Sequence, residues 1–204
     1  ADEFSITPGS LSKFSSQAFE YANPLLDEEQ FLQDISDAID TYKPDDGIPY
    51  VLIPTQRETQ LIAKHASRFS DRIAIAAPDF EHIEKVSDKG WLAKFADQQG
   101  LAVPTTLYPR SNDEMEQHID KLEMPVVVKI RSGIGGIGLE LCHSRADAVS
   151  IFADFMQRYE LSSEQAPIVQ QAVDGQDYCV CAIVENGVAT GITTYSSVGK
   201  RSSG

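Results

Sequence analysis

The chain has 204 residues, 42% of them hydrophobic, and it carries 31 acidic against 17 basic residues, for a formal net charge of -14 at pH 7. This content suffices for one large domain or two small ones, and the negative charge disfavours nonspecific attraction to nucleic acid or to an anionic membrane surface. No apolar run approaches the length of a membrane span and no basic-then-apolar signal opens the chain, so we expect a cytoplasmic protein.

The first part of the chain alternates helix and strand signals. A helix is expected over about 28–42, because Asp27 can cap it and apolar residues then recur at helical spacing. Residues 50–54 and 72–78 are short apolar β-branched runs, and the segment between them has helical spacing. This order predicts a parallel βαβ unit. We therefore assign residues 1–86 to a small Rossmann-like α/β domain and expect its N-terminal strand to be absent.

The second part, residues 87–204, has a different pattern. A helix capped near Ser87 and closed by Gly100 precedes an acidic helix around 111–122, and another helix is capped by Ser144. The strand-like runs are 101–109, 125–130, 138–144, 167–173 and 177–195, the last of which folds back as a hairpin at Glu185-Asn186-Gly187. The pattern is typical of an antiparallel sheet with helices on one side, so the fold class of the chain is α/β (α+β).

A glycine-rich loop stands out in "VVVKIRSGIGGIGLELCH", residues 126–143. Its glycines satisfy the G-x-G-x-x-G pattern of a dinucleotide-binding turn, which on its own would indicate an NAD enzyme. In such a turn a helix begins at the last glycine, but here residues 139–142 alternate at period two and a helix cap arrives only at Ser144. The loop therefore joins two strands. We predict that it folds over phosphates and offers backbone N–H groups where no side chain blocks their approach.

Lys129 ends the apolar run before this loop. An ammonium there is costly unless it meets an anion or its stem reaches the surface. At about 4 Å from a phosphate oxygen, with an effective dielectric near 20, the attraction is on the order of 4 kcal/mol before desolvation. A lysine on the solvent face of an edge strand stays open as an alternative, but the neighbouring glycines favour an anion.

Cysteines and histidines give no sign of a metal centre. Cys142, Cys179 and Cys181 are an odd number at a spacing that suits neither a disulfide framework nor a zinc site, so we expect reduced thiols packed in the core. The four histidines are scattered, and we assign none to a metal.

Three segments together resemble a known family. "VSDKGWLAKFADQQGLAVPTT", "PVVVKIRSGIGGIGL" and "PIVQQAVDGQDYCVCAIVENG", in this order and spacing, are similar to the ATP-grasp superfamily, particularly its carbamoyl phosphate synthetase and biotin carboxylase-like branch. The resemblance runs from about residue 28 to 195. It implies an ATP-grasp nucleotide-binding region over 87–204, with ATP and Mg²⁺ as cofactors.

The resemblance also implies roles for individual residues. Lys89 and Lys129 would contact the nucleotide phosphates. Gln171 and Val173 would read the adenine edge through their backbone, and Asp177 would bind the ribose hydroxyls; the family usually has glutamate at the positions of Gln171 and Asp177. The residues of the lid over the phosphates would be Ser132, Gly133, Gly135, Gly136 and Gly138.

The reaction implied is that of an ATP-dependent carboxylate-amine or related ligase, in which a carboxylate attacks the γ-phosphorus and an amine or other nucleophile captures the acylphosphate. Its magnesium ligands are expected outside this chain segment, since no acidic residue follows Glu185. We therefore expect a piece of a larger enzyme, inactive alone, with unknown catalytic residues. Its partners would be ATP, a small carboxylate and a nucleophile, with no nucleic acid or membrane; a homodimer stays open. The alternative is a non-catalytic nucleotide- or protein-binding module with the same kind of fold.

Overall fold

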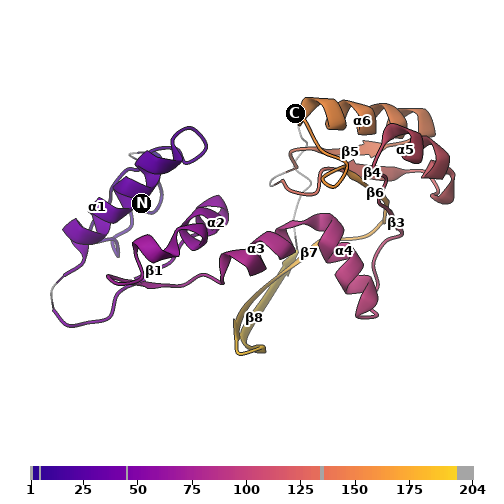
Figure 1. The fold of residues 1–204 in the computed structure, drawn as a ribbon. Helices are drawn as coiled ribbons and strands as arrows, with labels where there is room; N and C mark the ends of the chain where they lie inside the picture. The colour runs from indigo at the N-terminus through magenta and orange to yellow at the C-terminus, as the bar shows by residue number, and fades with distance from the viewer. Residues whose placement is uncertain (1, 5, 45, 134–135, 197–204) are drawn as a thin grey trace. The chain divides into compact units, whose positions relative to one another are not determined.

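The computed structural model describes residues 2–4, 6–44, 46–133 and 136–196. The chain forms two compact units, residues 1–85 and 86–204 (Figure 1). No helix among the described residues is both long and apolar enough to cross a membrane.

The first unit is built on the helix expected from the sequence. α1 (Glu28–Tyr42) begins after Asp27, whose Oδ1 accepts a hydrogen bond of 3.0 Å from the backbone N–H of Gln30. Its apolar stripe is buried, so the sequence prediction is confirmed. The buried core of this unit comprises Phe31, Leu32, Ile35, Ile39, Ile62 and Phe69.

The predicted βαβ order of the first unit is also confirmed. β1 (Val51–Leu52) and β2 (Ala74–Ile75) pair in parallel, and α2 (Gln56–Lys64) with the 3₁₀ turn η1 (Ala66–Arg68) lies between them in sequence. Both strands are shorter than the apolar runs that predicted them, and Val51 is half exposed. Regular pairing is thus confined to two residues a strand.

An additional helix precedes the one that the sequence predicted. α3 (Phe80–Ser87) was missed, and α4 (Lys89–Gln98) begins one residue later than expected. The cap is Asp88, whose carboxylate accepts from two backbone N–H groups, so the prediction of a cap near Ser87 is corrected by one position. Gly100, at φ +72°, closes the segment as predicted.

The second unit contains the predicted antiparallel sheet, in the order β3-β6-β4-β5. Its strands are β3 (Thr106–Leu107), β4 (Val126–Lys129), β5 (Leu139–Cys142) and β6 (Ile168–Gln171). The helices packed on it are α5 (Asn112–His118), extended by η2 (Ile119–Lys121), and α6 (Arg145–Arg158). The Ser144 hydroxyl caps α6 by accepting from Asp147 N, as the sequence predicted.

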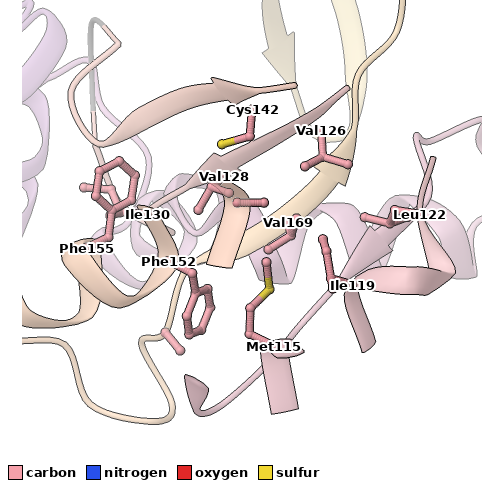
Figure 2. Close-up of a cluster of buried hydrophobic side chains, with 12 residues drawn as sticks. Met115, Ile119, Leu122, Val126, Val128, Ile130, Cys142, Phe152, Phe155 and Val169 are labelled. Atoms are coloured by element: carbon pink, nitrogen blue, oxygen red, sulfur yellow. The ribbon is translucent and has the colours of Figure 1, made fainter. Parts of the chain in front are cut away.

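One face of this sheet is covered by α5 and α6. Val126 and Val128 of β4, at 0% exposure, point into the same cluster as Met115 and Phe152 from the helices (Figure 2). Side chains alternate across a strand, so Val127 and Lys129 lie on the opposite face. The helices therefore bury one side of the sheet and leave Lys129 on the other.

A long hairpin follows the sheet. β7 (Tyr178–Glu185) and β8 (Val188–Ser196) are antiparallel, which confirms the predicted hairpin, and the two residues of its turn, Asn186 and Gly187, both have positive φ. Every side chain of β7 is exposed. Cys179 and Cys181 are therefore exposed, contrary to the expectation of core thiols, because both faces of this hairpin are open; Cys142 is buried as expected.

Candidate functional site

The sheet face opposite α5 and α6 forms an apolar floor around one lysine, and Ile168 on this face is buried. Lys129 pairs with Leu139 on β5 and with Ile168 on β6, and Val127 pairs with Leu141. Leu139 and Leu141 are 44% and 50% exposed. This floor combines exposed apolar side chains with a single ammonium, as expected for a ligand with an apolar ring and an anionic part.

A hydrogen-bonded chain holds the Lys129 ammonium. Its Nζ donates to Gln170 Oε1 at 2.7 Å, and Gln170 Nε2 donates to Thr106 Oγ1 at 2.8 Å. Thr106 donates in turn to the carbonyl of Pro104 at 2.8 Å. The two side chains of this hydrogen-bonded series, Gln170 and Thr106, carry no charge. Burial first, and the positive charge of Lys89 second, lower the pKa of Lys129.

The N-terminus of α4 brings a second lysine to the same place. The backbone N–H of Lys89 donates to the carbonyl of Arg131 at 2.9 Å, and its Nζ donates to the carbonyl of Gly133 at 2.9 Å. Burial lowers the pKa of Lys89, while the negative charge of Asp88 opposes this shift. Two lysines with lowered pKa values and like charges therefore share one site, an arrangement that a bound anion would stabilise.

Asp88 joins α4 to the end of β4. Its carboxylate caps α4 by accepting from Gly90 N at 2.8 Å and Trp91 N at 3.0 Å. It also accepts from Arg131 Nε at 2.9 Å and Nη2 at 2.8 Å, a bidentate pair. Burial raises the pKa of Asp88, but the hydrogen bonds from Arg131 and the two N–H groups outweigh it, so the net shift is downward.

The glycine loop, residues 132–138, connects β4 to β5 as predicted. Ile130 N donates to the carbonyl of Gly138 at 2.8 Å and closes the base of the loop. Gly138 has φ +64°, and a Cβ there would lie 2.5 Å from Ile130 Cδ1. Gly136 has φ +88° and open space around it. Gly135 lies outside the described residues, whereas Ser132 and Gly133 are exposed. Gly138 is therefore favoured by its positive φ and by the lack of room for a Cβ, whereas Gly136 is favoured by its positive φ alone.

The predicted adenine-binding segment follows β6. Gln171 uses its side chain within the fold: Nε2 donates to the carbonyl of Glu123 at 2.7 Å, and Oε1 accepts from Glu123 N at 3.0 Å. Val173 is 72% exposed, and among the described residues its N–H donates to no partner in the chain. Asp177 is exposed just before β7.

The structure shows direct interactions among some of the predicted site residues. Lys89 and Gly133 are in direct contact, and the charge of Lys89 acts on Lys129. Among the described residues, Val173 and Asp177 make no hydrogen bond with these three.

Sequence reasoning missed the polar residues that position the lysines: Thr106, Gln170, Arg131 and Asp88. Gln170 could have been found from strand alternation, because an antiparallel pairing of β4 with β6 places it on the face of Lys129. Arg131 lies next to the glycine loop, but its partner Asp88 is 43 residues away and no local pattern indicates the pair.

Metal-ligating side chains form no cluster among the described residues. Within residues 2–4, 6–44, 46–133 and 136–196, no group of three His, Cys, Asp or Glu side chains could hold a metal ion.

Comparisons with known proteins agree with this geometry. Residues 86–203 match the profile of a family described as the RimK-like ATP-grasp domain. No curated protein matches the chain significantly.

Several solved structures share the fold. They include the MgADP- and bicarbonate-bound biotin carboxylase domain of Hydrogenobacter thermophilus 2-oxoglutarate carboxylase (16% identity, TM-score 0.55, 78% of this chain and 34% of that one). D-alanyl-alanine synthetase A of Vibrio cholerae gives 14% identity and a TM-score of 0.57, over 74% of this chain and 47% of that one. A RimK domain ATP-grasp protein of Sphaerobacter thermophilus gives 20% identity and a TM-score of 0.50, over 73% and 55%. The chain thus spans about a third to about half the length of these proteins.

Proposed function

The chain belongs to the RimK-like ATP-grasp domain family, and from this membership we propose that it supplies the nucleotide-clamping part of an ATP-dependent carboxylate-amine or related ligase. The observation that carries the proposal is the pair Lys89 and Lys129, two lysines with lowered pKa values, of which one donates to the carbonyl of Gly133 in the glycine loop and the other ends the strand before this loop. A phosphate chain placed there would reduce the repulsion between the two ammonium groups and offset the free-energy cost of burying their charges.

Each group of the site has a task in this proposal. Lys89 and Lys129 bind phosphate oxygens, and the exposed N–H groups of the glycine loop close over them. The apolar floor of Val127, Leu139 and Leu141 takes the uncharged part of the nucleotide. The resemblance assigns the adenine edge to the backbone of Gln171 and Val173, and the ribose hydroxyls to Asp177.

In the proposed reaction a substrate carboxylate oxygen attacks the γ-phosphorus, the bond from this phosphorus to the bridging oxygen breaks, and ADP leaves. The acylphosphate then reacts with an amine, which forms the amide and releases phosphate. Magnesium would neutralise the β- and γ-phosphates during the transfer. The lysines of this chain hold the phosphates in line and stabilise the charge on their oxygens. The acid and the amine would be selected by other parts of such a ligase.

A lysine-reactive acylphosphate derivative of ATP tests where the phosphates lie. The reagent transfers its acyl group to an amine near the bound phosphate chain, and mass spectrometry identifies the lysine. We expect labelling of Lys89 and Lys129 in preference to Lys121, an exposed lysine of η2, and protection by excess ATP but not by NAD. Equal labelling of all three lysines, or protection by NAD alone, would contradict the proposal.

A further inference from the structure

The second unit contains a basic cavity that the nucleotide clamp does not use. The cavity has a volume of about 210 Å³ and neither Lys89 nor Lys129 lines it. Its walls come from α4, from the segment after β3, from the end of β4 and from the loop between α6 and β6. The polar and aromatic side chains of these walls are Lys94, Tyr108, Arg110, Arg131, Ser163 and Glu164.

The charge of this cavity is unusual for the chain. Three cationic side chains line it against one carboxylate, that of Glu164, whereas the chain as a whole has a formal charge of -14. Arg131 is neutralised by its bidentate pair with Asp88. Within the described part of the chain, neither Lys94 nor Arg110 has a carboxylate within ion-pair distance. Lys94 and Arg110 therefore form no ion pair, although the carboxylate of Glu164 lines the same cavity and that of Glu114 accepts from the backbone N–H of Arg110 at 2.9 Å.

The walls of the cavity are held in place by contacts that need no ligand. Lys94 Nζ lies 4.3 Å from the centroid of the Tyr108 ring, a cation-π contact. Arg131 Nη1 donates to the carbonyl of Glu164 at 3.1 Å and fixes the loop that closes the cavity. Burial raises the pKa of Tyr108, which is a partly buried wall of the cavity.

We propose that this cavity binds a small doubly charged oxyanion, a phosphate or a dicarboxylate, between Lys94 and Arg110. Two cations that form no ion pair attract an oxyanion of double charge more strongly than one of single charge, and an arginine donates in the planar geometry that phosphate and carboxylate oxygens accept. The volume is below the roughly 300 Å³ at which cavities begin to take drug-sized ligands. A nucleotide is therefore too large, and the site is separate from the nucleotide clamp.

Nuclear magnetic resonance of the full ¹⁵N-labelled chain tests the proposal, with inorganic phosphate and succinate as probes and acetate as the singly charged comparison. We expect saturable shifts of the backbone amides of Tyr108, Ser163 and Glu164 with at least one of the two dianions, and weaker binding of acetate. The dianion that binds more tightly identifies the class of ligand.

Variants separate this cavity from the clamp. Lys94→Gln combined with Arg110→Gln should weaken binding at the cavity amides by roughly tenfold or more. Lys121→Gln combined with Arg145→Gln removes the same charge from the second unit outside the cavity and should not weaken it. Lys129→Gln should leave the cavity shifts intact. If the spectrum of the double variant shows that it does not fold, the single variant Arg110→Gln takes its place in the comparison.

Three results would overturn the proposal: shifts that do not saturate with either dianion, shifts of the same size in the cavity variants as in the unaltered chain, or an equal loss in the Lys121 and Arg145 control. Shifts confined to Lys89 and Gly133 would assign the anion to the clamp and would overturn it as well.

Discussion

Asp88 is the residue whose replacement tests the architecture of the site most sharply, because its carboxylate both caps α4 and pairs with Arg131. Substitution by alanine removes both contacts. Substitution by asparagine keeps one side-chain oxygen for the cap, where Asn and Asp are equally favourable, and removes the charge together with the second oxygen, which accepts from Arg131 Nη2. The two variants therefore separate the cap from the ion pair.

The magnitudes follow from the two contacts. Loss of an N-cap costs about 1 kcal/mol of the free energy of unfolding, and hydrogen bonds to a charged group contribute about 1.5–3 kcal/mol. The Asp88 and Arg131 side chains are 31% and 22% exposed, so solvent screens the pair in part and the lower end of that range applies. We expect a loss of about 2–3 kcal/mol for Asp88→Ala and about 1–2 kcal/mol for Asp88→Asn.

Urea unfolding followed by the fluorescence of Trp91, the one tryptophan of the chain, measures these losses on the helix itself. Asp97→Asn, at the exposed end of the same helix, is the matched control for charge and should change the midpoint little. The pKa of Asp88 is lowered in the folded state. The contribution of the pair is therefore complete above the ordinary aspartate pKa and is lost as the pH falls through the lowered one.

A double-mutant cycle between Asp88→Asn and Arg131→Gln isolates the pair. A coupling free energy below about 0.5 kcal/mol, or an Asp88→Asn variant as stable as the unaltered chain, would refute the reasoning.

Three further changes have expected outcomes. Gly138→Ala should lower the free energy of unfolding by about 2–4 kcal/mol, because the new Cβ would overlap Ile130 and the φ of this residue is positive. The control Gly136→Ala, in open space, should lower it by only about 1–2 kcal/mol. Equal urea midpoints for the two variants would contradict the steric argument. Lys129→Met should raise the urea midpoint at neutral pH while it abolishes nucleotide binding. Because the pKa of Lys129 is lowered in the folded state, the unfolded chain binds the lysine proton more tightly, and the charged lysine lowers the free energy of unfolding. This loss of stability is complete below the lowered pKa and disappears as the pH rises from there to the ordinary lysine pKa. A lower urea midpoint for Lys129→Met would refute this. Gln170→Leu should weaken ATP binding by roughly three- to tenfold, because it removes the acceptor that orients Lys129, and unchanged calorimetric affinity would show that the hydrogen bond has no such role.

Local patterns were sufficient wherever the deciding interactions are close in sequence. The bounds of α1 agree with the prediction of 28–42, because its cap and its apolar stripe lie within the segment. The loop between β4 and β5 was distinguished from a Rossmann turn by the period-two alternation after Gly138, and both strands are present. These features depend on backbone preferences and on burial of one face.

Two kinds of feature could not be predicted from the sequence. Some depend on contacts between residues far apart in the chain, and others on a choice between two neighbouring residues that suit the same position equally well. Ser87 and Asp88 are both good N-caps, and the pairing of Asp88 with Arg131, invisible in the sequence, favours the second. Cys179 and Cys181 lie in a run as apolar as a core strand, yet the hairpin exposes both of its faces. The division into domains at 86/87, and the nucleotide contacts of Val173 and Asp177, stay predictions.

The central claim is that the glycine loop and the two lysines clamp the phosphates of ATP, and a calorimetric titration of the chain with ATP tests it most directly. The account predicts saturable binding of ATP, none of NAD, and a loss of roughly tenfold or more in affinity for Lys129→Gln, while Lys121→Gln binds like the unaltered chain. Equal affinities for the Lys129 and Lys121 variants, or tighter binding of NAD than of ATP, would contradict it.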